Sequence, residues 1–163
     1  MRYAGFWIRV VASIVDSVIL GSINLGIAFL LVGDYYMELF RSVAEGRGPT
    51  QPTDAFFGLL ALTYVLQIVI SWLYLAWFES SQHQATPGKM VFHLKVVDER
   101  NRRISFARAT GRTFGKYLSS MICMIGWLMV AFTERKQGLH DMIAGTFVVP
   151  DEPSPPLAGE KSR

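Results

Sequence analysis

A carboxylate in an otherwise apolar stretch is the clearest candidate for chemistry in this sequence. Asp16 is the only charged residue from Val10 to Val32, a run of the ~20 residues that a helix needs to cross a bilayer. An ionised carboxylate at that depth costs about 3 kcal/mol or more unless it is paired, hydrated or protonated. Asp16 is therefore a candidate proton- or cation-binding group. The alternative is a polar group that only fixes helix packing through a hydrogen bond.

Polar side chains continue from Asp16 along one side of the predicted first helix. A helix turns ~100° per residue, which gathers the following residues within about one quadrant: Arg9, Ser13, Asp16, Ser17 and Asn24. A second apolar segment carries a similar stripe, formed by Thr63, Gln67, Ser71 and Tyr74. We expect the two stripes to face each other rather than lipid. Arg9 and Asp16 are about 10 Å apart along the helix axis, so they pair only through long side-chain reach or a bridging group.

The other motifs are weak signals for chemistry. The segment 86–89, Thr-Pro-Gly-Lys, lacks the spacing of a phosphate-binding loop. The histidines His83, His93 and His140 lack metal-ligand spacing, and packed or solvated histidines are the simpler interpretation. No local Ser/His/Asp constellation supports hydrolysis. We therefore expect no enzyme activity, no metal, no cofactor and no nucleic-acid binding.

Composition and the length of the apolar segments indicate an integral membrane protein. The chain has 163 residues, of which 51% are hydrophobic, more than an ordinary soluble domain contains. Its three apolar segments are 10–32, 55–78 and 117–133. The predicted fold class is an α-helical integral membrane protein with two transmembrane helices. The shorter third segment either spans the bilayer or re-enters it.

Charged residues differ on the two sides of the second apolar segment. Segment 33–54 contains four acidic and two basic residues, whereas segment 79–116 contains eight Lys or Arg residues. The positive-inside rule places the N-terminus and segment 79–116 in the cytoplasm and segment 33–54 outside. For segment 117–133 a re-entrant course, turning near Gly126, would return Arg135 and Lys136 to the cytoplasm.

A small cytoplasmic sheet is predicted beside the membrane. Residues 91–97 alternate in the manner of a strand, residues 98–102 form a polar turn, and residues 103–104 begin a short return strand. Residues 146–149 are a further strand candidate and would complete a three-stranded sheet. That pairing requires the C-terminal strand to share a compartment with the hairpin, which favours the re-entrant course.

A basic helix is predicted to follow the hairpin. Ser105 can cap it, and Arg108, Arg112 and Lys116 recur every four positions. We expect an interfacial helix with its cations at lipid phosphates, although a simple positive-inside flank explains the charges equally well. Residues 150–163 are predicted to form a disordered tail, which leaves residues 1–149 as a single membrane domain.

Several motifs, taken together and in order, resemble the RDD family of membrane proteins. They are segment 3–9 with Asp16, segment 86–89 followed by 94–98, then Ser105, 108–109 and Arg112, and the ending His-Asp-x-x-Ala-Gly-Thr at 140–146. The resemblance covers nearly all of residues 3–149. It implies that the arginine and two aspartates that name the family are Arg9, Asp16 and Asp141. It also implies a small bacterial membrane protein for which transport, including cation/proton exchange, is the usual suggestion.

These residues support two interpretations of function. In the first, Arg9, Asp16, His140 and Asp141 bind a cation or proton in a transporter or transporter subunit. Two or three helices cannot enclose an aqueous path, so this interpretation requires a homo-oligomer or a membrane partner protein. In the second, the Arg and Asp residues form a structural polar network in a non-transporting assembly or interaction module. Both place a multi-pass protein in the lipid bilayer of the bacterial inner membrane.

Both interpretations also predict where the charged groups lie. Desolvated charges seek partners, so we expect Asp141 to lie at the cytoplasmic membrane surface close to Arg9. We further expect Arg9 and Asp16 to be energetically coupled through their shared helix face.

The charge distribution gives a direct test of topology. Cysteines introduced at positions 47 and 102 should be labelled by membrane-impermeant reagents from opposite sides of the membrane, because the basic flank of a transmembrane helix stays in the cytoplasm. Labelling of both positions from one side would contradict this topology.

Overall fold

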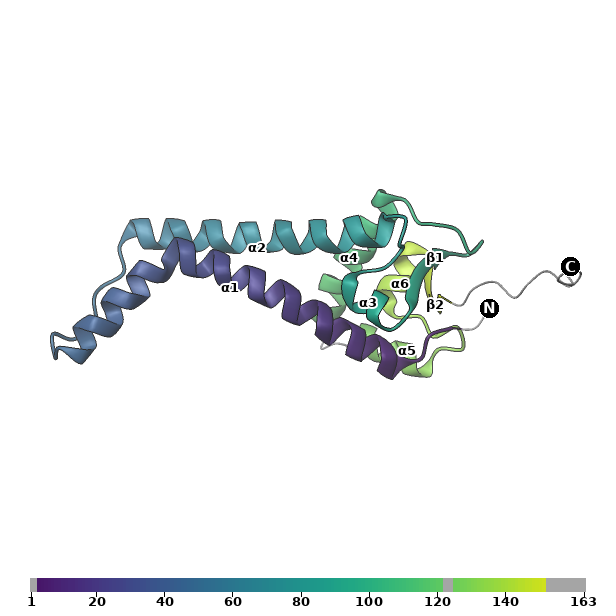
Figure 1. Cartoon of the computed structure of the whole chain (residues 1–163), viewed down its shortest axis with the longest axis horizontal. Helices are drawn as coiled ribbons and strands as arrows, with labels where there is room; N and C mark the ends of the chain where they lie inside the picture. Colours follow the sequence, from purple (N-terminus) through teal and green to yellow (C-terminus); the bar gives the residue numbers. More distant parts are fainter. Residues whose placement is uncertain (1–2, 122–124, 152–163) are drawn as a thin grey trace, which may run out of the picture.

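The computed structural model describes residues 3–121 and 125–151 of the chain. Two long helices lie side by side, and the remaining elements gather at one end of this pair (Figure 1). We call the gathered part, residues 81–121 and 125–151, the cap. The elements in chain order are α1 (Phe6–Ala44), α2 (Asp54–Ser80), α3 (Pro87–Val91), β1 (Leu94–Asp98), α4 (Phe106–Met121), α5 (Ile125–Phe132), α6 (Leu139–Ala144) and β2 (Thr146–Pro150).

The two long helices match the first two apolar segments. With 39 and 27 residues, α1 and α2 are ~58 and ~40 Å long at the rise of an α-helix. Each is therefore long enough to cross a hydrocarbon core of ~30 Å. Only 6% of the residues in each apolar window are buried within the protein, and no other helix among the described residues is long and apolar enough to span a membrane. Their side chains thus face outward, as those of lipid-exposed helices do.

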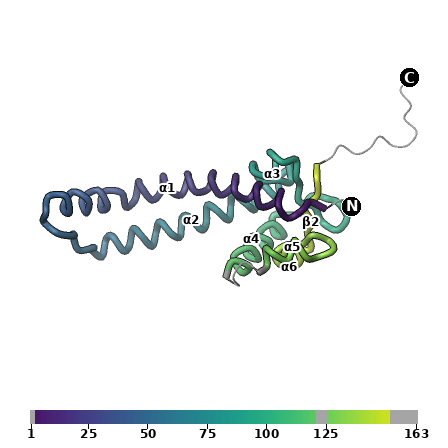
Figure 2. Tube along the Cα trace, turned by 90° about the horizontal axis from the view of Figure 1, so that it is seen from below, coloured from purple at the N-terminus to yellow at the C-terminus, as the bar shows by residue number. Residues whose placement is uncertain are grey.

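The cap and the α1–α2 loop lie at opposite ends of the helix pair (Figure 2). The start of the described chain belongs to the cap end, because the Ala4 N–H donates to the Val148 carbonyl at 2.9 Å. This arrangement agrees with the expected topology, in which segments 33–54 and 79–116 lie on opposite sides of a membrane.

The described part of the cap contains a two-stranded antiparallel sheet instead of the expected three-stranded one. β1 and β2 pair so that Val96 lies opposite Val148. The expected return strand at 103–104 is reduced to a single bridge between Val97 and Arg103. The Asp98 carboxylate accepts backbone N–H groups from the residues that follow it, which holds segment 98–102 in a tight turn.

The strand β1 also begins later than expected. The helix α3 occupies residues as far as Val91, and His93 has a φ of 50°, which lies outside the strand region. From Leu94 onward the expected alternation holds. Leu94 and Val96 pack in the core with Val148, while Val97 packs on the other face.

The third apolar segment folds back within the cap. A Cβ atom on Gly126, in α5, would lie 2.5 Å from Ser119 Oγ, in α4. At ~1.5 Å rise per residue a continuous helix would separate positions 119 and 126 too far for this contact. Gly126, near which the turn was expected, lies inside α5, and residues 122–124 lie outside the described residues. Beyond α5 the chain returns through α6 to β2, beside β1, which agrees with the re-entrant course.

The boundary of the expected tail differs slightly from the structure. Pro150 belongs to β2, and the Asp151 N–H donates to the His93 carbonyl at 2.6 Å. Residues 152–163 lie outside the described residues, so the disordered tail stays a prediction.

Candidate functional site

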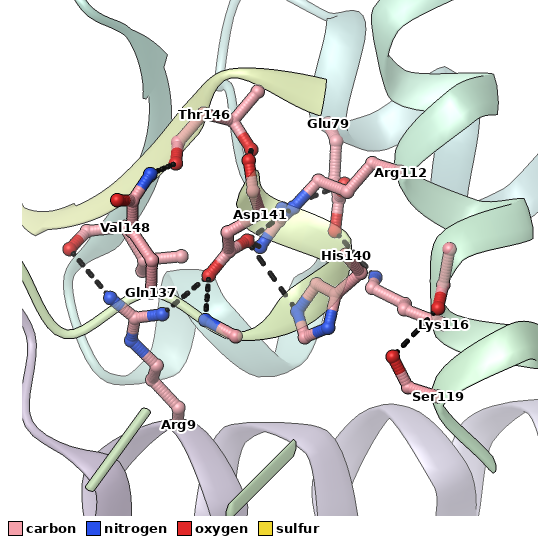
Figure 3. A network of polar contacts seen from close by, with 12 residues as sticks. Arg9, Glu79, Arg112, Lys116, Ser119, Gln137, His140, Asp141, Thr146 and Val148 are labelled. Atoms are coloured by element: carbon pink, nitrogen blue, oxygen red, sulfur yellow. Dashed lines mark hydrogen bonds and ion pairs between the residues drawn. The ribbon is translucent and has the colours of Figure 1, made fainter. Parts of the chain in front are cut away.

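Asp141 lies between two arginines inside the cap (Figure 3). Its Oδ2 accepts a hydrogen bond from Arg9 Nη1 at 2.8 Å, and its Oδ1 accepts one from Arg112 Nε at 2.8 Å. Asp141 is 0% and Arg112 is 1% exposed. Arginine stays charged in proteins, and its planar guanidinium matches a carboxylate. These charge-assisted hydrogen bonds join α1, α4 and α6, and they confirm the expected proximity of Arg9 and Asp141.

Local structure orients both partners of the Arg9–Asp141 pair. Asp141 lies in the first turn of α6, where its Oδ2 also accepts the Gly138 N–H at 3.3 Å and so caps the helix. Gly145 ends α6 with a φ of 60°, which glycine adopts without the cost of a Cβ. β2 starts at the next residue and brings the Val148 carbonyl to 3.2 Å from Arg9 Nη2.

Glu79 forms a second anionic centre at the end of α2. Its carboxylate pairs with Arg112 at 2.8 Å, with Lys116 at 2.9 Å and with Lys89. Glu79 has no exposed surface. Arg112 bridges the two centres because it contacts both Glu79 and Asp141. The network therefore connects five helices, α1, α2, α3, α4 and α6.

Asp16 is held separately from this network by uncharged donors. Its Oδ1 accepts the Gly88 N–H at 2.8 Å and the Tyr74 hydroxyl at 3.0 Å, and its Oδ2 accepts the Thr86 hydroxyl. Because Thr86 is the N-cap of α3, Asp16 fixes the start of α3 against α1. Tyr74 is one helical turn from the end of the second apolar segment, so Asp16 lies near the cap end of the helix pair.

Burial and neighbouring charges set the protonation of groups in the cap. Burial alone would raise the pKa of Asp141, but the charges of Arg112 and Arg9 hold it well below its usual range. Burial lowers the pKa of His140 to about 3, so its imidazole is neutral at physiological pH. Burial, aided by the cations Lys116 and Arg112 and opposed by Glu79, lowers the pKa of Lys89 to about 7.

A pocket lies beside the network, between α1 and the cap. Its empty volume is about 410 Å³ including its open mouth. The polar part of its lining consists of Ser13, His140 and the four cations Arg9, Lys89, Arg112 and Lys116. The apolar part includes Trp127, whose ring centroid is 4.9 Å from that of His140. Among the described residues no group of His, Cys, Asp and Glu side chains is arranged to hold a metal ion.

One expectation about the charged residues is wrong, and another stays a prediction. Arg9 and Asp16 do not contact each other, because Arg9 binds Asp141 and Asp16 binds three uncharged donors, and their energetic coupling stays a prediction. Arg112 and Lys116 do not point to lipid phosphates, because both turn inward to Glu79. The Ser105 cap is confirmed, since its hydroxyl accepts the Arg108 N–H at 3.3 Å.

Glu79 and the roles of Gly88 and Lys89 were not predicted from the sequence. Glu79 directly follows the uncharged segment 55–78. A desolvated charge at the edge of an apolar segment seeks a partner of opposite charge, so a cation near Glu79 could have been expected, as it was near Asp141. Lys89 and Gly88 were noted only as part of a weak phosphate-loop pattern. Their spacing gives no further signal, because their partners lie on other helices.

Comparison with known sequences identifies the family of this chain. Residues 3–145 match the sequence model of the RDD family. The chain belongs to the RDD family. The uncharacterized protein YxaI of Bacillus subtilis is 37% identical over 151 residues, which cover 90% of this chain and 96% of that protein.

A second Bacillus subtilis relative, the uncharacterized membrane protein YteJ, is 32% identical over 90% of this chain and 80% of its own length. The proline-rich antigen of Mycobacterium leprae is 28% identical over 89% of this chain and 60% of that protein. No solved structure shows significant similarity to this RDD-family chain. The family and the two long apolar helices identify it as a membrane protein of RDD type.

The close approach of α3 to α1 predicts that Gly88→Ala destabilises the protein. A Cβ at this position would lie 2.2 Å from the Ala12 carbonyl oxygen and 2.8 Å from Asp16 Cγ, so α3 must move away. Overpacking of this kind costs about 1–3 kcal/mol, which a lower melting temperature in detergent would report. The control is Gly111→Ala in α4, where a Cβ would meet nothing within 4 Å. Equal melting temperatures for the two variants would contradict the close contact.

The depressed pKa of Asp141 predicts an acid-dependent stability. A carboxylate with a folded-state pKa below its unfolded value of about 3.9 stabilises the fold above that value, and this contribution is lost as the pH falls. Asp141→Asn should therefore cost about 3–5 kcal/mol at neutral pH and flatten the acid side of the melting-temperature profile. Asp151→Asn, at an exposed pair with Lys95, should leave the profile unchanged. An unchanged profile in Asp141→Asn would show that the carboxylate is not ionised in the network.

Proposed function

We propose that this RDD-family protein is a non-transporting membrane assembly or interaction module. In this proposal the buried Arg, Asp and Glu side chains lock the cap to the transmembrane helix pair and present it at the cytoplasmic surface of the bacterial inner membrane. The protein is then multi-pass and carries out no catalytic step. The cap is the part that a partner recognises.

The observation that carries this proposal is the pairing of the buried charges across helices. Arg9, Glu79 and Asp141 each bind groups on other elements. A buried charge whose partner is removed costs several kcal/mol, so such a network resists rearrangement. An exchange site instead needs a carboxylate that gains and loses its partner during turnover. The geometry supports a rigid connection better than a cycle of that kind.

The outward faces of the two long helices support an assembly. Because α1 and α2 cover so little of each other's surface, most of their apolar side chains are open to lipid or to neighbouring helices. We infer a homo-oligomer or a complex with another membrane protein. Helices of this kind associate through close packing and hydrogen bonds.

Cation or proton exchange is the second candidate function. One observation favours it: the pKa of Lys89 is about 7, so this buried amine titrates in the physiological range. Lys89 lines the same pocket as Arg9 and His140. In this version a proton would exchange at Lys89 and at Asp16, whose carboxylate accepts a hydrogen bond from the N–H of the neighbouring Gly88.

Substitutions of Asp16 separate the two candidates. If Asp16 is structural, Asp16→Leu leaves three donors unpaired, each worth about 1–3 kcal/mol, and increases hydrogen exchange of the α3 and β1 amides. Asp16→Asn should be milder, because the amide oxygen still accepts two of the donors. Asp34→Asn, at an exposed position on α1, is the matched control.

Flux measurements show whether the proposed non-transporting module is wrong. In proteoliposomes with a cation gradient, the proposal predicts the same proton flux for the wild type, Asp16→Asn and protein-free vesicles. A cation-dependent proton flux that Asp16→Asn abolishes, without a change in melting temperature, would replace the proposed module with a transporter.

A further inference from the structure

The buried network carries more positive than negative charge. Four cationic side chains contact the two carboxylates Glu79 and Asp141, so with Lys89 protonated the positive excess is two, and it is one when Asp16 is also counted. An uncompensated charge is costly in a protein interior. The cationic side chains are Arg9, Lys89, Arg112 and Lys116.

The excess charge faces one pocket. All four cations line it, and no carboxylate is among its described lining residues. The carboxylates Asp141 and Glu79 contact these cations, and Figure 3 shows Asp141 between Arg9 and Arg112, with Glu79 on the far side of Arg112 from Asp141. The pocket surface is therefore electropositive, with the converging donors that a phosphate oxygen binds.

An unpartnered histidine nitrogen marks the same pocket. His140 lines it and is only 3% exposed, yet its Nδ1 has no hydrogen-bond partner among the described residues. Buried polar atoms without a partner are uncommon in folded proteins, and each one calls for an explanation, of which a bound water or ligand is one. A neutral imidazole can donate to an anion or accept from its hydroxyl, depending on the tautomer.

We propose that this pocket binds the phosphate group of an anionic ligand. Arg9, Arg112 and Lys116 supply the positive charge, and His140 Nδ1 supplies one further hydrogen bond. The bound anion offsets the charge excess of the network. It also stabilises the protonated form of Lys89, whose pKa of about 7 reflects burial among other cations.

The surroundings of the pocket suit a phosphate that carries an apolar chain. Phe6 and Trp127 form part of its wall. A second, mainly apolar hollow shares Ser13, Lys89, Lys116 and Trp127 with it. It extends along the two long helices past Asp16 to Leu20 and Leu75. A phospholipid whose headgroup phosphate enters the first pocket could lay an acyl chain along this hollow. A free phosphate or a soluble phosphate monoester has the same binding group without the chain.

Two series of melting-temperature measurements distinguish a phospholipid from a free phosphate as the ligand. The full chain is purified in an uncharged detergent, and its melting temperature is measured with sodium phosphate against sodium chloride of equal ionic strength. In the second series it is measured with phosphatidylglycerol against diacylglycerol, and native mass spectrometry counts the bound lipid. Stabilisation by both identifies a general phosphate site, and stabilisation by phosphatidylglycerol alone identifies a lipid site. Stabilisation by neither overturns the proposal.

Matched lysine variants test where the anion binds. Lys116→Met removes one cation from the pocket, while Glu79 keeps its contacts with Lys89 and Arg112. The variant should bind the probe that stabilises the wild type, phosphate or phosphatidylglycerol, about tenfold more weakly. Lys95→Met makes the same change at a lysine outside this pocket and should leave binding unchanged. Equal weakening in both variants would show nonspecific attraction to surface charge and overturn the proposal.

A second variant covers the case in which Lys116→Met does not fold. His140→Phe keeps a ring beside Trp127 but removes the unpartnered Nδ1, together with Nε2, which lies 3.4 Å from Asp141 Oδ1. At a temperature where the variant is folded, it should bind the same probe more weakly than the wild type does. Unweakened binding in His140→Phe and in every folded Lys116 variant would overturn the proposed site.

Discussion

The ionised carboxylate of Asp141, held between Arg9 and Arg112, is the interaction on which the cap depends. Asp141 can stay charged without any exposed surface only because both arginines bind it. Neither α6, with 6 residues, nor α3, with 5, is long enough to be stable alone. A two-stranded sheet is also marginal by itself. The charged contacts, together with the small apolar core, give these short elements fixed positions.

The features with a strong local signal were the ones that the sequence predicted well. The two long helices follow from their apolar segments, and the pairing of β1 with the C-terminal strand follows from β-branched residues on both. The direction of the basic side chains was predicted wrongly. Helical phase places Arg112 and Lys116 on one face, but it does not say whether that face turns to lipid or to the interior. The deciding partner, Glu79, lies 33 residues before Arg112 and 37 before Lys116, at the end of another helix.

Asp16 and Asp141 are held in different ways, and this difference bears on function. Asp141 binds cations, whereas Asp16 binds two hydroxyls and one backbone N–H. A carboxylate with three uncharged donors is anchored as an acceptor, and any cation that displaced them would release the start of α3 from α1. Proton or cation exchange at Asp16 would therefore be coupled to movement of the cap. A static connecting role requires no such movement.

The position of the network near the membrane surface explains how a charge excess can persist there. In the interior of a soluble domain an excess cation would lose its proton or unfold the region. Beside a bilayer with anionic lipids, the negative surface potential offsets cationic groups near the headgroups. A phosphate bound in the pocket would do the same at shorter range, and with the geometry of a specific site. Stability of the cap would then depend on the anions at the membrane surface, so a module that is fixed by its own ion pairs would also respond to the composition of the surrounding membrane.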